Sequence, residues 1–201
     1  MSLNNLQSLD LDALKLIVKE LFEQKLSPTM LFHNYEHTLL VYKAVNEIGI
    51  NANLTDSELK VLQVSALFHD TGYTEKYFGH EDASIEIVKD YLEKFGADLQ
   101  FIESVQACIF ATKYPQVPTS KLEQIICDAD FYHFSLPNYL SFAKALKEEW
   151  AVHICVDYTE ESWNRLNLEM LQKHQYFTDY GQNVLQSKKE ENIRTLVNFV
   201  T

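Results

Sequence analysis

The stretch FHNYEH, residues 32–37, places two histidines four residues apart and an asparagine beside the first of them. Four residues are close to one turn of an α-helix, so His33 and His37 share a face if both are helical. Asn34 is a residue type that often caps the start of a helix. The stretch therefore predicts a helix that begins near Asn34 and carries His37 on its inward face. The apolar residues expected on that face are Leu40, Ala44 and Ile48.

A second stretch, LFHDTGY at residues 67–73, sets His69 and Asp70 side by side ahead of a glycine. The chain before it contains TDSE at residues 55–58, a capping-box pattern that is typical of a helix start. The predicted helix ends at His69 and Asp70, and both continue its inward stripe by one more turn. The apolar residues of that stripe are Leu59, Leu62 and Ala66. The sequence thus predicts a second pair of polar side chains on an inward face.

The whole chain has helical periodicity and little period-two alternation. Its 201 residues include only 5 Gly and 4 Pro, fewer turn residues than a chain rich in hairpins needs. We therefore predict an all-α helical bundle of eight or nine helices, forming one domain over residues 1–201. Its motif core spans residues 32–131, and C-terminal helices at 138–200 pack on it. The expected helices are 6–24, 34–48, 55–70, 81–95, 99–112, 121–131, 138–151, 160–177 and 182–200.

Charge and cysteine content limit the class of partner. The net charge of −12, from 17 Lys+Arg and 29 Asp+Glu, repels nucleic acid and anionic membranes, so neither is an expected partner. No apolar run reaches the 18 residues of a membrane span, and the N-terminus lacks the apolar region of a signal peptide. The three cysteines follow no disulfide or zinc-site spacing. Reduced thiols and a cytoplasmic location are expected.

Polar groups on inward helix faces are costly to bury unless a partner satisfies them. A single inward histidine is usually a hydrogen-bonded core residue, but here His37, His69 and Asp70 occur together. Imidazole nitrogens and carboxylate oxygens are the ligand types of divalent metals. A fourth ligand can come from the run CDAD, which offers Asp128 and Asp130. Both lie at the margins of their helix's apolar stripe, on opposite sides, and periodicity does not choose between them.

The order His, His-Asp, Asp resembles the HD-domain superfamily of metal-dependent phosphohydrolases, over about residues 32–131. The resemblance implies that His37, His69, Asp70 and a later aspartate bind one divalent cation. Mn, Mg, Fe, Ni, Co and Zn are not distinguished. Related members commonly have Ala-Asp before a hydrophobic residue, which favours Asp130 over Asp128. A second cation is not expected, because further histidines between the HD pair and the last aspartate are scarce.

The pattern HNxxH at residues 33–37 resembles the cyclic-nucleotide phosphodiesterase branch. By that resemblance, His33 is the general acid that protonates the leaving oxygen. Three more residues are candidates for contact with substrate: His80, Lys113 and Asn34. Each also has a structural interpretation, as a helix-terminal hydrogen-bonding residue, a solvated lysine and a helix cap, respectively. Lys189 is expected on a solvated face of the last helix.

The resemblance implies a phosphohydrolase or phosphodiesterase that hydrolyses a small phosphate ester, a nucleotide, with a metal-activated water. The alternative is a non-catalytic sensor that keeps the metal and binds a nucleotide without turnover. A di-iron oxygenase on the same scaffold is a third interpretation, which the scarcity of further histidines disfavours. The expected partner is a small phosphorylated substrate, and the sequence is compatible with an oligomer.

Overall fold

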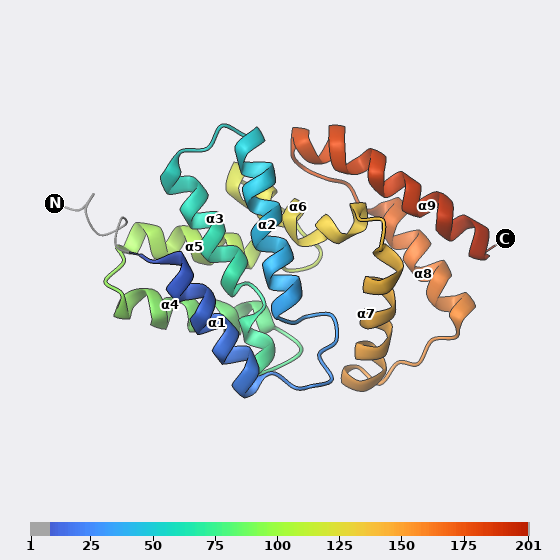
Figure 1. The fold of residues 1–201 in the computed structure, drawn as a ribbon, viewed down its shortest axis with the longest axis horizontal. Coiled ribbons are helices and arrows are strands. Elements are labelled where there is room, and N and C mark those ends of the chain that lie inside the picture. The colour runs from blue at the N-terminus through green and yellow to red at the C-terminus, as the bar shows by residue number, and fades with distance from the viewer. Residues whose placement is uncertain (1–8, 201) are drawn as a thin grey trace.

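The computed structural model describes residues 9–200, and the regular elements of that range are all helical (Figure 1). The all-α fold predicted from the sequence is confirmed. The α-helices are α1 (Leu11–Lys25), α2 (Tyr35–Asn51), α3 (Asp56–Phe68), α4 (His80–Lys94), α5 (Leu99–Ala111), α6 (Lys121–Asp130), α7 (Tyr139–His153), α8 (Glu160–Lys173) and α9 (Gln186–Val200). Two short 3₁₀ helices, η2 (Thr71–Thr74) and η3 (Phe131–Ser135), and one π-helical turn, η4 (Gly181–Leu185), complete the described chain.

Local capping explains where several helices begin. The side chain of Asn34 accepts hydrogen bonds from the first turn of α2, as predicted. Thr55 and Glu58 form the predicted capping box at the start of α3. Asp10 caps α1, so this helix begins at Leu11 rather than near residue 6. Residues 6–8 of that predicted helix lie outside the described residues.

The C-terminal helices differ from the prediction at their ends. Helix α8 stops at Lys173 instead of continuing to residue 177, and an extended segment follows it. The reason is a tertiary contact with Asp128 of α6. Its carboxylate accepts hydrogen bonds from the backbone of Phe177 (2.8 Å) and from the backbone and hydroxyl of Thr178 (2.9 and 2.6 Å). A β-carbon on Gly181 would lie 2.3 Å from an Asp128 oxygen, so glycine is required for this close approach.

The described residues form two hydrophobic clusters. The larger one is built mainly from α1 to α6, with Tyr132, Tyr176 and Leu185 from later in the chain, and the last five residues of α3 are fully buried. The smaller one joins η3, α7, α8 and α9 through Phe134, Tyr139, Ala143, Leu171 and Leu196. Figure 1 shows α7, α8 and α9 grouped at the C-terminal end of the molecule. That the whole chain is one domain stays a prediction.

None of the helices within residues 9–200 has the length and apolar character that crossing a lipid bilayer requires.

Candidate metal centre

The start of α2 holds His37 in place. The side-chain oxygen of Asn34 accepts the N–H of Glu36 (3.0 Å) and of His37 (3.2 Å). The first turn of α2 is therefore fixed, and the buried His37 ring points into the molecule from it. The contacts of Asn34 are those of a helix cap.

The end of α3 presents His69 and Asp70 side by side, and both are buried. His69 Nδ1–H donates to the carbonyl oxygen of Ala66 at 2.9 Å. Since a carbonyl only accepts, this bond leaves the Nε2 lone pair of the neutral ring free to act as a ligand. Local backbone geometry thus orients the imidazole before any ligand binds.

Four side chains from three segments converge here. The Nε2 atoms of His37 and His69 lie 3.4 Å apart, and Asp70 Oδ2 lies 3.5 and 3.1 Å from them, respectively. Asp130 Oδ1, at the end of α6, lies 3.3 Å from His37 Nε2 and 3.7 Å from His69 Nε2. The structure brings together all four residues named as ligands from the sequence.

The buried cluster contains polar atoms whose interactions are not satisfied by the surrounding protein. Asp70 Oδ2 is buried without a hydrogen-bond donor among the described residues. Two imidazole nitrogens at 3.4 Å repel each other unless a proton or a cation lies between them. His37, His69 and Asp70 each offer a ligand atom, and these atoms lie within 4.8 Å of one another. Two imidazoles with carboxylate oxygens are a donor set that fits a divalent cation.

The electrostatics of the cluster agree with this fit. Burial alone would lower the pKa of His69, but the adjacent Asp70 raises it to about 9. Burial opposes ionisation of Asp70 and Asp130, yet the neighbouring histidines hold the pKa of each below its ordinary value. Without a cation, the cluster therefore holds protons at neutral pH. A divalent cation would take their place, so metal binding would release protons.

His33 lies just before the cap of α2 and is held by a residue that the sequence analysis missed. Glu149 of α7 is fully buried and accepts His33 Nδ1–H at 2.5 Å. The same carboxylate accepts the backbone N–H of Phe32 (2.8 Å) and of His33 (3.1 Å), and the Tyr77 hydroxyl (3.0 Å). Glu149 follows another glutamate on a surface helix, which is a pattern typical of solvated acids. Only the tertiary fold distinguishes Glu149 from such a solvated glutamate.

Tyr73 and His80 continue the site on the other side of His33. The ring of Tyr73 stacks on His33 with centroids 4.3 Å apart, and on His80 at 3.8 Å. His80 Nε2 faces Asp70 Oδ1 at 3.6 Å. His80 therefore lies beside the carboxylate of the HD pair, and its ring centroid is 6.2 Å from that of His33. Tyr73 belongs to the short helix η2.

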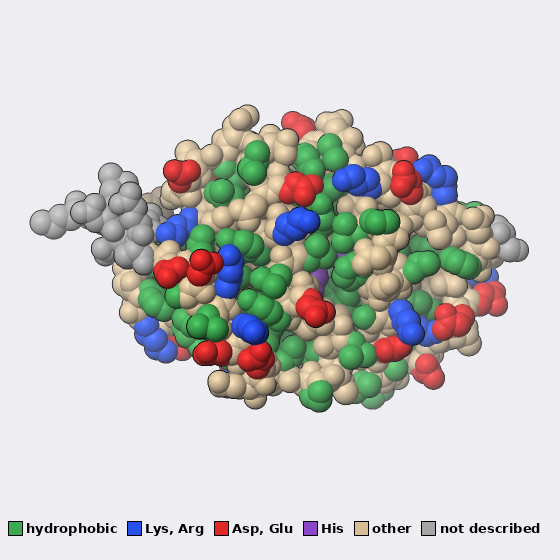
Figure 2. Space-filling model, viewed as in Figure 1, with side chains coloured by type: hydrophobic (Ala, Val, Ile, Leu, Met, Phe, Trp, Pro, Cys, Tyr) green, Lys and Arg blue, Asp and Glu red, His purple; other side chains and the backbone are tan. Residues whose placement is uncertain are grey.

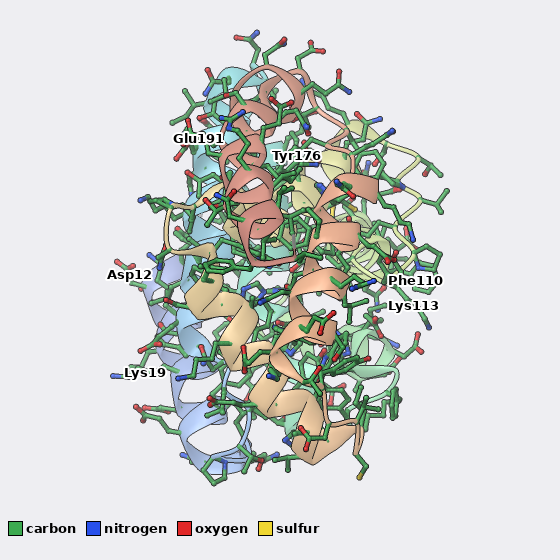
Figure 3. All side chains as sticks on the ribbon, turned by 90° about the vertical axis from the view of Figure 1, so that its right-hand side faces the viewer. Asp12, Lys19, Phe110, Lys113, Tyr176 and Glu191 are labelled. Atoms are coloured by element: carbon green, nitrogen blue, oxygen red, sulfur yellow. The ribbon has the colours of Figure 1, made fainter. Side chains whose placement is uncertain are left out.

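Lys113 lies away from the cluster. Its ammonium pairs with Asp82 at 3.3 Å and lies over the ring of Phe110. Figure 3 shows Lys113 beside Phe110 at the edge of the molecule. In place of Lys113, Gln116 of the following segment reaches the cluster, because its Nε2 donates to Asp130 Oδ2 at 3.3 Å.

Asp128 and Asp130 have different environments. The Asp128 carboxylate is engaged by the segment at 177–178, whereas that of Asp130 faces the histidines. Figure 2 shows a few histidine atoms recessed near the middle of one face, between hydrophobic side chains and other atoms.

The sequence model of the HD domain family matches residues 34–135, half of the chain. The chain therefore belongs to the HD domain family, a superfamily made up mostly of metal-dependent phosphohydrolases. The matched range contains His37, His69, Asp70 and Asp130. No curated protein and no solved structure matches the chain.

Proposed function

We propose that this protein is a metal-dependent phosphohydrolase that cleaves a small phosphodiester, with a nucleotide as substrate. The observation that carries the proposal is the convergence of His37, His69, Asp70 and Asp130 on one point, where a buried carboxylate oxygen lacks a donor. Membership of the HD domain family supports the reaction class.

The four residues would hold one divalent cation. The two carboxylates would balance the charge of a divalent cation and the two imidazoles are neutral, so the loaded site would carry no net charge. When bound, the cation supplies Lewis acidity, which lowers the pKa of water and neutralises charge on the phosphoryl oxygens. A loaded centre of this kind tolerates an anionic ester despite the net charge of −12 of the chain.

His33 is the proposed general acid. Because its Nδ1–H is bound by Glu149, the proton available for a leaving oxygen is on Nε2. Burial alone would lower the pKa of His33, but the hydrogen bond to Glu149 and the nearby carboxylates raise it above its ordinary value. The protonated form of the ring is therefore favoured relative to an ordinary histidine, and Tyr73 is stacked on it. Glu149 acts through His33 and is a positioning residue.

His80 and Asn34 are proposed to contact the substrate phosphate, His80 from its position beside Asp70. Lys113 could do so only after leaving its pair with Asp82. The buried free thiols of Cys108 and Cys127 favour a reducing compartment, and we propose the cytoplasm.

The test is hydrolysis of bis(p-nitrophenyl) phosphate and of a nucleotide panel, with Mn²⁺, Mg²⁺ or Ni²⁺. We expect turnover by the wild type and, in His33→Ala, unchanged metal content with a rate about 10²–10⁴-fold lower. Absence of turnover with every metal would refute the hydrolase. A normal rate in His33→Ala would remove His33 from its role.

The alternative is a sensor that binds a nucleotide without cleaving it. The engagement of His33 by Glu149 and Tyr73 is the observation that favours it, since a strongly held acid is less free to follow a leaving group. Ligand-induced thermal stabilisation without hydrolysis would support the sensor.

A further inference from the structure

A pocket of about 430 Å³ adjoins the candidate metal centre. It lies between the segment after α5, the end of α6 and the end of α8. Aromatic and apolar side chains dominate its wall. The residues that define this aromatic pocket are Tyr114, Phe131, Phe134, Met170, His174 and Phe177. A concave, mainly apolar site with a few placed polar groups is the usual form of a small-molecule pocket.

His174 supplies a placed polar group. The ammonium of Lys189 donates to the backbone oxygen of His174 at 2.6 Å and lies 3.3 Å from its Nδ1. Lys189 is buried, contrary to the solvated face expected from the sequence. An ammonium group has only donors, so Nδ1 must accept and the ring proton must be on Nε2.

The Nε2–H of His174 has no partner among the described residues, although the atom is buried. Burial and the charge of Lys189 lower the pKa of His174 to about 3, so the ring stays neutral. The rings of Phe131 (5.0 Å), Phe134 (5.1 Å) and Tyr176 (4.6 Å) pack around it. Native structures rarely leave such a donor unpaired, and His174 is one of the residues that line the pocket, so a turn of its ring would bring the donor to a partner there.

The aromatic pocket shares a wall with the metal cluster. Phe131 follows Asp130 directly in the chain. Gln116 also lines the pocket, and its amide donates to Asp130 Oδ2 at 3.3 Å. A ligand in the pocket is thus adjacent to a residue of the cluster.

We infer that the aromatic pocket binds the heteroaromatic base of the substrate, with His174 Nε2–H donating to a ring nitrogen or carbonyl oxygen of that base. This inference rests on the proposed function, in which the phosphate reaches the cluster. A nucleobase offers both properties that the pocket demands, a π-face for the aromatic rings and an in-plane acceptor for the imidazole. An aliphatic phosphate ester would use neither.

The test measures nucleoside binding, because a nucleoside carries the base without a phosphate. The full chain, loaded with Mn²⁺, is titrated by calorimetry with adenosine, guanosine, cytidine and uridine, and with ribose as the base-free probe. We expect at least one nucleoside to bind and ribose not to bind. His174→Phe keeps a ring and removes the donor, so binding should weaken about tenfold.

A second variant guards against misfolding of the first. Met170→Trp fills the pocket and should abolish nucleoside binding. Leu99→Trp is its matched control, because it adds the same indole at an exposed position of α5 and should bind nucleosides as the wild type does. Metal content and melting temperature are measured for each variant.

The two proposals fail separately, because binding of a nucleoside requires no turnover. The pocket assignment does not depend on the hydrolysis result. It is overturned if no nucleoside binds. It is also overturned if both folded variants, Met170→Trp and His174→Phe, bind nucleosides as the wild type does. If nucleosides bind, Met170→Trp prevents it and no phosphate ester is cleaved, the pocket assignment stands and the hydrolase proposal falls.

Discussion

The two oxygens of the Asp70 carboxylate have different partners. Oδ2 faces the Nε2 atoms of His37 and His69, whereas Oδ1 faces His80 at 3.6 Å. Because Asp70 is buried, its charge requires compensation from these neighbours or from a cation. A single residue thus connects the candidate metal ligands with the ring proposed to contact substrate.

The first prediction concerns metal retention. His69→Ala and Asp70→Ala should each abolish bound metal, since each removes a ligand atom from the buried cluster. Elemental analysis of the purified variants by mass spectrometry measures this. Asp82→Ala, which removes an exposed aspartate of α4, is the control and should retain metal. A full metal complement in Asp70→Ala would contradict the assignment.

The second prediction concerns pH. The pKa of His33 is raised, so the acid stays protonated to higher pH, and kcat/KM should fall as pH rises through that pKa. Glu149→Gln keeps an oxygen acceptor but removes the negative charge. It should therefore move the alkaline limb of the profile to lower pH while metal content is unchanged. An alkaline limb at the same pH in both proteins would show that Glu149 does not tune His33.

Helix α6 illustrates how one element serves two purposes. Asp128 and Asp130 are two residues apart, so their side chains leave the helix in different directions. Asp128 holds the segment that follows α8, and Asp130 faces the histidines at the ends of α2 and α3. The helix therefore connects the C-terminal part of the chain with the candidate metal centre.

The third prediction separates these two aspartates. Asp128→Asn should lower the free energy of unfolding by about 1–3 kcal/mol, because an amide cannot accept all the hydrogen bonds from residues 177 and 178. Its metal content should stay at the wild-type level. Asp130→Asn should instead weaken metal binding. Urea denaturation and elemental analysis of both variants test this, and the reverse pattern would make Asp128 the ligand.

At the scale of the molecule, the candidate ligands come from α2, from the end of α3 and from α6. A cation held by all of them cross-links segments that lie far apart in the sequence. Next to the cluster, the loop at 32–33 contacts α7 through the hydrogen bond between His33 and Glu149. Metal binding and global stability are therefore linked.

The fourth prediction follows from this linkage. Removal of the cation with a chelator should lower the melting temperature, and restoring it at about 100 times its dissociation constant should stabilise the fold by about 2.7 kcal/mol. Scanning calorimetry measures the shift. His69→Ala should show no response to added cation, so an equal shift in this variant would place the binding elsewhere.

The sequence by itself determined the helical class, the caps at Asn34 and Thr55, and the inward direction of His37, His69 and Asp70. These features depend on periodicity and on contacts within about four residues, which any reader of the sequence can evaluate. The order of the motifs also indicated the HD domain family, which the family match confirms.

Helix periodicity left Asp128 and Asp130 equivalent and only the family resemblance favoured Asp130, whereas the tertiary structure places Asp130 against the histidines. It also decided that Glu149 binds His33, although 116 residues separate them, and that Lys189 is buried against His174. Such contacts depend on how distant helices pack, and the local pattern around each residue resembles that of an ordinary solvated helix surface. Local physics selects the elements, whereas the partners of buried charges are set by packing.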